Sequence, residues 1–358
     1  MRAVSFESDD YEQAVETFFD KGWSDGLPVV LPTRKLVEAM IAAGGRDRDE
    51  NLGPIGPKNN DATVEMLAIN AVMGGCKPEY FPIVLAAMEA MLAPEHNLTG
   101  VIQTTHMCCP LVIVGGPIAK ELKFNSREGI FGNGYRANAT VGRAVRLAIW
   151  NIGGAVPWET DMSTMSHPGE YTFCIAEEEE ENPWPPLHVE RGCAPGSNAV
   201  TVFACEPPHS VDAQGTPAEM LYSIGDSLIG LGNNNAHYAG QTLVVINRRQ
   251  AAEFAKAGWS KDDIRHHLWD NARRPGGELK ACGVFHEGMR KALVEQKRTL
   301  ARYDYTKLDD ASRIPVTDRP EDIHIVVAGG VAYFAAVLPG WGAFGGYAVT
   351  RPVRIPGR

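Results

Sequence analysis

The sequence predicts an α/β or α+β fold in which helices pack against mixed sheets. Residues 110–117 form a continuous apolar run that ends in a glycine turn, which is typical of a buried strand leading into a helix. Residues 139–152 place apolar side chains at helical spacing. Residues 331–354 are rich in glycine, aromatic and β-branched residues, as the closing strands of a mixed sheet are. Strand and helix signals therefore follow one another along the chain after residue 98.

The first segment, residues 1–97, is predicted to be mainly helical. Thr33 can cap a helix, Asp61 can open the next one, and Pro78 stands in a first helical turn, where proline is tolerated. A link rich in glycine, proline and asparagine over 44–60 separates two pairs of helices. The predicted helices are 9–20, 34–43, 61–73 and 78–92.

The middle segment, residues 98–210, is predicted to be an α/β domain that carries an anion-binding loop. Its acidic, proline-rich stretch 177–198 indicates a long exposed loop, and the run from Glu177 to Glu181 indicates a solvated surface. The predicted strands of this segment are 99–105, 110–117, 171–176 and 199–204. Its predicted helices are 117–123 and 139–152.

The last segment, residues 211–358, is predicted to be a second α/β unit with C-terminal strands. Residues 111–122 and 243–254 share four apolar strand residues, a three-residue turn and a helix start, which indicates duplicated α/β units. With only two short copies, chance similarity explains the pattern equally well. The predicted helices of this segment are 216–230, 249–257, 260–273 and 286–300. Its predicted strands are 242–247 and 324–330.

The composition favours a cytoplasmic protein with a small-molecule partner. The 358 residues carry a formal net charge of −10 and no dense basic segment, which argues against a nucleic-acid partner or an anionic membrane surface. There is no run of about 18 apolar residues, and the N-terminus turns acidic where a signal peptide turns apolar. The 7 cysteines include no Cys-x-x-Cys pair and are predicted to be reduced thiols. The sequence does not decide whether the chain forms a homo-oligomer.

Residues 125–143 form a glycine-punctuated stretch that carries asparagine and arginine just before an apolar helix. Its glycines permit close backbone approach, and the helix start presents unpaired N–H groups. Arg136 and Arg143 are predicted to hold a carboxylate or phosphate through paired hydrogen bonds. The alternative is a structural loop with two surface arginines, since no phosphate-loop fingerprint is matched. The candidate substrate-binding residues are Asn125, Arg136, Asn138, Arg143, and a glycine pair that follows a strand, Gly329 and Gly330.

Two cysteines are candidates for a reactive thiolate. Cys76 follows a glycine turn and precedes a helix, and both the helix N-terminus and the neighbouring Lys77 favour a thiolate. Cys109 lies with His106 and Cys108 between two predicted strands, which allows a Cys–His nucleophile pair. The alternative for each cysteine is a buried thiol that serves only packing.

Metal binding and acid–base catalysis are the other chemistry that the sequence allows. His106 and Cys108 are soft metal ligands, but no zinc spacing accompanies them, so a metal ion stays an alternative and the cofactor stays unknown. Asp161 and His167 lie in the loop 158–170, which is crowded with ionisable and hydroxyl groups, and both are candidates for moving protons. A loop rich in caps and turns has the same composition.

Six motifs span most of residues 20–275. They are Trp-Ser-Asp-Gly-Leu-Pro-Val-Val from Trp23, Gly-Cys-Lys-Pro-Glu-Tyr from Gly75, Tyr-Arg-Ala-Asn-Ala-Thr-Val-Gly-Arg from Tyr135, Glu-Thr-Asp-Met from Glu159, His-Pro-Gly from His167 and Leu-His-Val-Glu-Arg-Gly from Leu187. Together they resemble an uncharacterised bacterial family that accompanies, or is joined to, small UGSC-type (seleno)proteins. The resemblance implies thiol or selenol redox chemistry. This chain has no Cys-Gly-Ser-Cys motif, so the reactive thiol would be one of its own cysteines or belong to a separate subunit.

We therefore expect an enzyme that acts on a small anionic, carboxylate-bearing substrate by thiolate-assisted lyase or redox chemistry. Cys76 or Cys109 would be the thiolate, and His106, Asp161 or His167 would move protons. The alternatives are a metal-dependent hydrolase and a non-catalytic scaffold that positions a small thiol or selenol protein partner.

Overall fold

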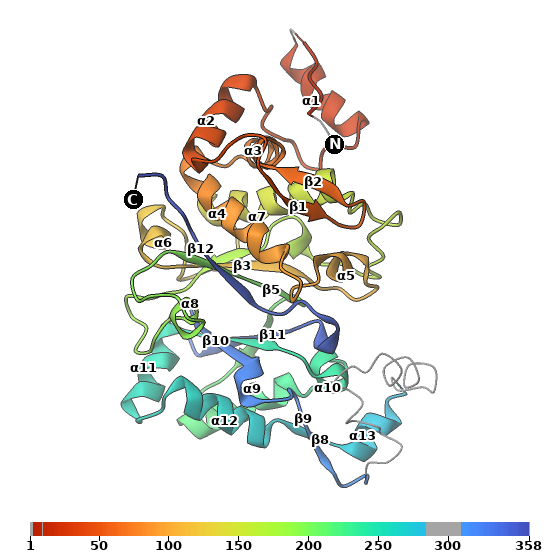
Figure 1. Ribbon diagram of the computed structural model, residues 1–358. Helices are drawn as coiled ribbons and strands as arrows, with labels where there is room; N and C mark the ends of the chain where they lie inside the picture. The colour runs from red at the N-terminus through yellow and green to blue at the C-terminus, as the bar shows by residue number, and fades with distance from the viewer. Residues whose placement is uncertain (1–2, 9, 284–308, 358) are drawn as a thin grey trace.

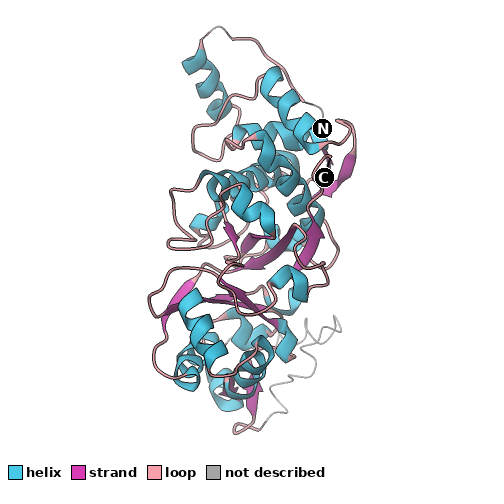
Figure 2. Ribbon diagram, turned by 90° about the vertical axis from the view of Figure 1, so that its left-hand side faces the viewer, coloured by secondary structure: helices cyan, strands magenta, loops and turns pink. Residues whose placement is uncertain are grey.

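The computed structural model describes residues 3–8, 10–283 and 309–357. This part of the chain stacks a layer of helices, two sheets, and a further layer of helices (Figures 1 and 2). The arrangement confirms the α/β or α+β class with mixed sheets and packed helices. The helix expected at 286–300 lies outside the described residues.

The N-terminal region combines helices with a short hairpin. Its elements are α1 (Tyr11–Asp20), α2 (Arg34–Gly44), β1 (Asn51–Ile55), β2 (Asn60–Thr63), α3 (Val64–Met73), the 3-10 turn η1 (Pro78–Tyr80) and α4 (Phe81–Met91). Side-chain oxygens of Asp10, Thr33 and Thr63 accept N–H groups in the first turns of α1, α2 and α3. The link expected at 44–60 instead holds the antiparallel β1–β2 hairpin, so the helix expected from Asp61 begins after it.

The strand expected at 99–105 is wrong. These residues form most of α5 (Leu98–Gln103), because Asn97 accepts the Gly100 N–H group and caps a helix there. Leu98, Val101 and Ile102 are buried, so their apolar character serves a short helix face rather than a strand.

The first sheet has the strand order β12-β5-β3-β4. Its strands are β3 (Cys109–Gly115), β4 (Cys174–Ala176), β5 (Ala199–Cys205) and β12 (Val349–Pro352). β4 runs parallel to β3, whereas β5 is antiparallel to β3 and to β12. One face of this sheet packs against α3, α4 and α7 in a shared core. The other elements of this part are α6 (Pro117–Glu121), α7 (Arg136–Ala148), the π-helical turn η2 (Ile149–Gly153), η3 (Pro168–Glu170) and α8 (Leu187–Glu190).

The second sheet has the strand order β10-β7-β11-β6. Its strands are β6 (His209–Asp212), β7 (Thr242–Ile246), β10 (Ile323–Val327) and β11 (Phe334–Pro339). α9 (Pro217–Leu228), α11 (Arg248–Lys256) and α12 (Lys261–Asn271) cover its outer face and confirm three expected helices. The remaining elements are α10 (Asn234–Tyr238), β8 (Arg273–Pro275), α13 (Gly276–Ala281), β9 (Arg313–Pro315), η5 (Pro320–Asp322) and η6 (Gly342–Phe344).

The two sheets share one topology and exchange one strand each. In both, a central strand (β3 or β7) leads into a helix, a parallel strand follows (β4 or β10), and the next strand (β5 or β11) returns antiparallel. After β5 the chain crosses to the second sheet as β6, and after β11 it crosses to the first as β12. The segments 98–210 and 211–358 are therefore joined by more than a linker, because β12 completes the first sheet.

The inner faces of the two sheets pack on each other. Leu111 of β3, Phe203 of β5, Val245 of β7 and Leu338 of β11 lie in one buried cluster. His324 of β10 lies between the sheets as well, with its ring edge-on to Phe203 at 5.9 Å between centroids. Its Nε2 lies 3.0 Å from Gln241 Oε1, which also accepts the Ala348 N–H group.

Replacing His324 by glutamine should flatten the loss of stability in acid. Burial lowers the pKa of His324 from 6.5 to about 3, so the unfolded chain binds one more proton between these values. The free energy of unfolding therefore falls as pH drops from 6.5, by up to about 1.4 kcal/mol per pH unit for this group. Urea unfolding of both proteins between pH 7 and pH 4.5 measures the difference in slope, and parallel curves would contradict the assignment.

Candidate functional site

Four of the five predicted catalytic side chains gather at the amino end of β3. Cys109 is the first residue of β3, His106 lies in the turn before it, and Asp161 and His167 come from the loop between η2 and β4. Arg146, in the last turn of α7, lies beside them. We call this group the thiol cluster; its members are Cys109, His167, Arg146, Glu170, Asp161, His106 and Glu206.

The centre of the thiol cluster is a contact between Cys109 and His167. Cys109 Sγ lies 3.1 Å from His167 Nε2, and both side chains are buried. The Gly169 N–H group donates to His167 Nδ1 at 3.1 Å, so the proton of the neutral ring is on Nε2, the nitrogen that lies beside the sulfur; the Cys205 backbone is also within reach of the ring. Burial, together with the nearby Arg146, lowers the pKa of His167 to about 4. His167 is thus a neutral hydrogen-bond donor to Cys109 at neutral pH.

Arg146 supplies the positive charge of the cluster. Its guanidinium donates through Nε to the Glu170 carbonyl at 3.0 Å, and its Nη2 lies 3.8 Å from the Glu170 carboxylate. Burial raises the pKa of the Cys109 thiol, and Arg146 opposes that rise. The resting thiol is therefore protonated, with a cation close enough to favour a thiolate or a bound anion.

Two further acidic members of the thiol cluster are Asp161 and Glu206. Asp161 is buried and accepts the Ser163 N–H group, and burial raises the pKa of its carboxyl. His106 Nε2 lies 2.9 Å from Glu206 Oε1, and both side chains are partly exposed. Of the thiol cluster, the His106–Glu206 pair is therefore a part that solvent reaches.

Cys76 lies apart from the thiol cluster. Its Sγ donates to the Thr140 carbonyl at 3.2 Å, and burial raises its pKa to about 12 in spite of Arg136 nearby. The thiol is a buried hydrogen-bond donor, because desolvation outweighs the helix start and the lysine that favoured a thiolate in the sequence.

The two arginines that are predicted to hold an anion, Arg136 and Arg143, bind protein groups. Arg136 donates to the Gly75 carbonyl through Nε and Nη2, at 3.1 and 2.9 Å. Arg143 forms a two-point ion pair with Asp25, at 2.9 and 2.8 Å, and donates to the Leu27 and Pro28 carbonyls. Arg143 thereby fixes the turn that follows Trp23 against α7.

The other predicted binding residues lie at the opposite end of the first sheet. Asn138 and Asn125 bond to each other: Asn138 Oδ1 accepts the Asn125 N–H group, and Asn138 Nδ2 donates to the Asn125 carbonyl. Gly329 donates its N–H group to the Ser126 carbonyl at 2.8 Å, and Gly330 lies against Glu128. β3 and α7 separate this region from Cys109, so the predicted anion loop and the thiol cluster are distinct places.

The two possible metal ligands, His106 and Cys108, lie in different surroundings, because His106 pairs with Glu206. Cys108 is buried in an apolar cluster with Val101 and Ala204. Among the described residues, no group of three or more His, Cys, Asp or Glu side chains is arranged to hold a metal ion.

The acidic run 177–181 is only partly solvated, which makes the expectation of a solvated surface wrong for its first two residues. Glu177 and Glu178 are buried. Glu177 lies 3.5 Å from the ammonium of Lys261, and Glu178 accepts from Arg127 Nε at 2.7 Å. Cations from distant parts of the sequence draw these carboxylates inward.

Comparison of the chain with protein-family models, with curated proteins and with solved structures gives no match. In residues 3–8, 10–283 and 309–357, none of the helices has the length and apolar composition needed to span a bilayer.

The sequence did not single out Arg146, Glu170 or Glu206. Arg146 stands on a helix whose neighbouring positions are apolar, and a charged residue on a buried helical face is the signal that marks it. Glu170 ends the polar loop 158–170 and Glu206 follows the last residue of β5. Polar side chains are common at such places, so these two residue types carry no comparable signal.

Proposed function

We propose that the protein is an enzyme that acts on a small carboxylate-bearing substrate through the thiol of Cys109, by lyase or thiol-dependent redox chemistry. The observation that carries the proposal is the 3.1 Å contact between Cys109 Sγ and His167 Nε2 beside Arg146. A thiol, a fixed imidazole and a guanidinium in one place form the set that thiol catalysis on an anionic substrate needs.

Each group has a separate role in this proposal. The Arg146 guanidinium uses only Nε for a hydrogen bond of normal length among the described residues, so its Nη groups can hold a carboxylate. The His167 Nε2–H group stabilises the sulfur when it carries negative charge. Asp161, a buried carboxyl group whose charge acts on Cys109, is the group that we assign to moving a substrate proton in a lyase reaction.

One observation favours the redox form of the proposal. Cys109 and Cys205 are directly opposite each other in the antiparallel β3–β5 ladder, at a separation that a disulfide can span. Oxidation of both thiols would release two protons and pass two electrons to a disulfide or peroxide co-substrate.

Alkylation of the native protein by iodoacetate and by iodoacetamide tests the reactive thiol. We expect Cys109 to prefer the anionic iodoacetate by about tenfold, relative to the exposed Cys282, because Arg146 attracts its carboxylate. Both rates should rise about tenfold per pH unit from pH 7 to pH 9, since the raised pKa keeps the thiol protonated there. Peptide mass spectrometry gives the rate at each cysteine.

Matched variants separate the role of Arg146 from general reactivity. Arg146→Gln should abolish the preference for iodoacetate, whereas Arg136→Gln should leave it unchanged because Arg136 binds Gly75 instead. Cys174, buried in β4, gives the baseline of a packed thiol. A Cys109 that reacts no faster than Cys174, without preference between the reagents, would refute the proposal.

A further inference from the structure

A second site lies at the other end of the first sheet. A cavity of about 530 Å³ opens at the carboxyl ends of β3 and β4, between the start of α6, the loop 123–128, Tyr135 and the segment 177–180. We call it the junction pocket. Ligands of α/β proteins bind where parallel strands end, and a cavity of this size holds a small molecule.

The junction pocket lies where the two sheets meet. The Glu178 N–H group donates to the carbonyl of Val327, the last residue of β10, at 2.8 Å. The Gly329 N–H group donates to the Ser126 carbonyl, also at 2.8 Å. Backbone bonds therefore tie two walls of the pocket to the carboxyl end of the parallel pair in the second sheet, which gives the pocket a fixed shape.

Glu179 presents an available carboxylate on the acidic wall. Its Oε1 accepts the Gly116 N–H group at 2.5 Å, while its Oε2 has no hydrogen bond among the described residues. Glu178 is already bound by Arg127 and Ser126, and Glu177 turns inward to Lys261. Of the acidic wall, Glu179 is the partly exposed carboxylate that remains free to bind a ligand.

The residue behind Glu179 does not neutralise it. The ring of His188 is buried, and its Nδ1 lies 3.5 Å from Glu179 Oε1. Within the described part of the chain, neither ring nitrogen has a hydrogen bond of normal geometry, although the Ser197 backbone is close enough to favour the protonated ring. Burial dominates and lowers the pKa of His188, so the ring is neutral at pH 7. Burial raises the pKa of Glu179, although the Gly116 N–H group and Lys261 oppose that rise, and a cationic group of a ligand would favour the charged carboxylate further.

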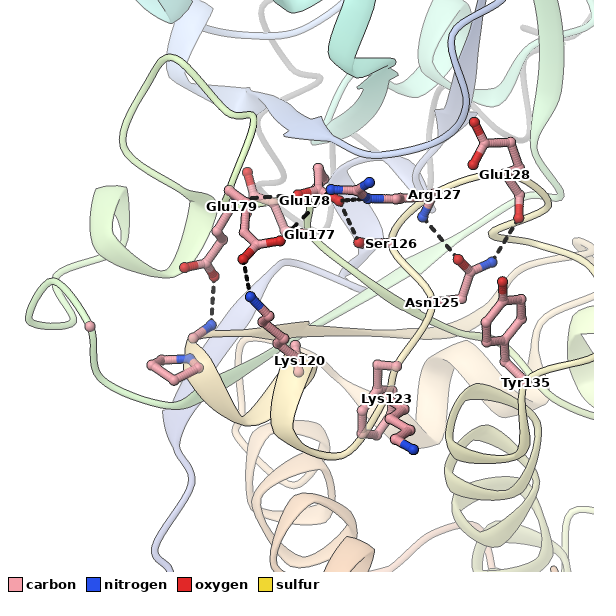
Figure 3. Close-up of a pocket in the computed structure, with 16 residues that line it drawn as sticks. Lys120, Lys123, Asn125, Ser126, Arg127, Glu128, Tyr135, Glu177, Glu178 and Glu179 are labelled. Atoms are coloured by element: carbon pink, nitrogen blue, oxygen red, sulfur yellow. Dashed lines mark hydrogen bonds and ion pairs between the residues drawn. The ribbon is translucent and has the colours of Figure 1, made fainter.

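The opposite wall is basic. Figure 3 shows Lys120 and Lys123 below Glu178 and Glu179, with Tyr135 at one side; the Lys120 ammonium points toward the glutamates and that of Lys123 is turned away from them. Lys120 reaches Glu180, whereas Lys123 Nζ has no hydrogen bond or ion pair with any described residue. The pocket is thus lined by Glu179, which has an available carboxylate oxygen, and by Lys123, an exposed lysine whose ammonium is available.

We propose that the junction pocket binds a small zwitterion of the amino-acid type, with its ammonium at Glu179 and its carboxylate at Lys123. A ligand with both charges pairs with each available group, whereas a singly charged ligand leaves one of them unpaired. The junction pocket does not involve the Cys109 thiol at the amino end of β3. Its binding of a zwitterion can therefore be tested separately from the proposed function.

Binding of matched ligands to the full chain tests the proposal. Glycine, 4-aminobutyrate and 6-aminohexanoate are the zwitterions, and butyrate and butylamine carry one charge each. We expect at least one zwitterion to bind at least tenfold more tightly than butyrate and butylamine, as measured by calorimetry or ligand-observed NMR at low salt. Glu179→Gln and Lys123→Met should each weaken that binding at least tenfold.

Two controls keep the result specific. Glu181→Gln removes one negative charge from a residue that follows the acidic wall in sequence and does not line the pocket. It should change the affinity less than twofold. Cys109→Ser should leave the affinity unchanged. The urea midpoint of each variant establishes that it is folded. Absence of binding by all three zwitterions at 10 mM, or equal binding of butyrate or butylamine, would overturn the proposal.

Discussion

Replacing Lys261 by methionine should lower the free energy of unfolding by about 3–5 kcal/mol. The Lys261 side chain is buried at the start of α12, with its ammonium 2.8 Å from the Pro185 carbonyl, 3.1 Å from Glu190 and 3.5 Å from Glu177. Glu177 is more deeply buried than Glu190. Methionine fills a similar volume but leaves the Glu177 carboxylate without its cation, and a buried charge without a partner is costly. Urea unfolding at pH 7 measures the loss.

Two companion variants identify the cause of this loss. Lys256→Met, on the exposed side of α11, should change the stability by no more than about 0.5 kcal/mol. Adding Glu177→Gln to Lys261→Met should restore part of the stability, since a neutral amide oxygen can still accept the Leu187 N–H group that Glu177 binds. A double variant as unstable as the single one would show that lost packing, not charge, is responsible.

The fold could be predicted where local signals and burial agree. The apolar runs of β3, β5, β7 and β10 are fully buried strands, so their composition was sufficient. The segment 99–105 is also rich in β-branched residues, yet most of it is helical because Asn97 caps a helix there. The exchange of β6 and β12 depends on pairing across more than a hundred residues, which no local pattern encodes.

Four members of the thiol cluster, Cys109, His106, Asp161 and His167, were accessible from the sequence because their residue types are informative in themselves. Cysteine and histidine beside a strand start, and a polar loop that precedes the neighbouring strand, place Cys109 and His167 within reach of each other. The binding partners of the two predicted anion-binding arginines were not accessible from the sequence. The partner of Arg143, for example, is Asp25, which lies 118 positions earlier. Sequence pattern indicates what a side chain can bind, and the tertiary fold decides which partner reaches it first.

Ending the chain at Tyr347, which removes β12, should abolish cooperative unfolding. β12 pairs with β5 from Val349 to Pro352, and Val349 and Val353 belong to the main core of the first sheet. Thr350 also accepts from Arg191 Nε at 2.8 Å. All seven residues of β5 are buried, so loss of β12 turns a core strand into an exposed apolar edge, which promotes aggregation. The penalty should exceed the whole stability of a typical domain, about 5–15 kcal/mol.

The exchange of strands makes this prediction specific to β12. β6 holds the matching position in the second sheet, but three of its four residues are exposed, so weakening that edge should cost less. A chain that ends at Pro356 keeps β12 and should unfold like the full protein. A peptide of residues 346–357, added in excess during refolding, should restore a cooperative urea transition to the shortened chain. A shortened chain that unfolds cooperatively without the peptide would show that the first sheet is complete with three strands, and that the crossing of β12 contributes nothing essential to it.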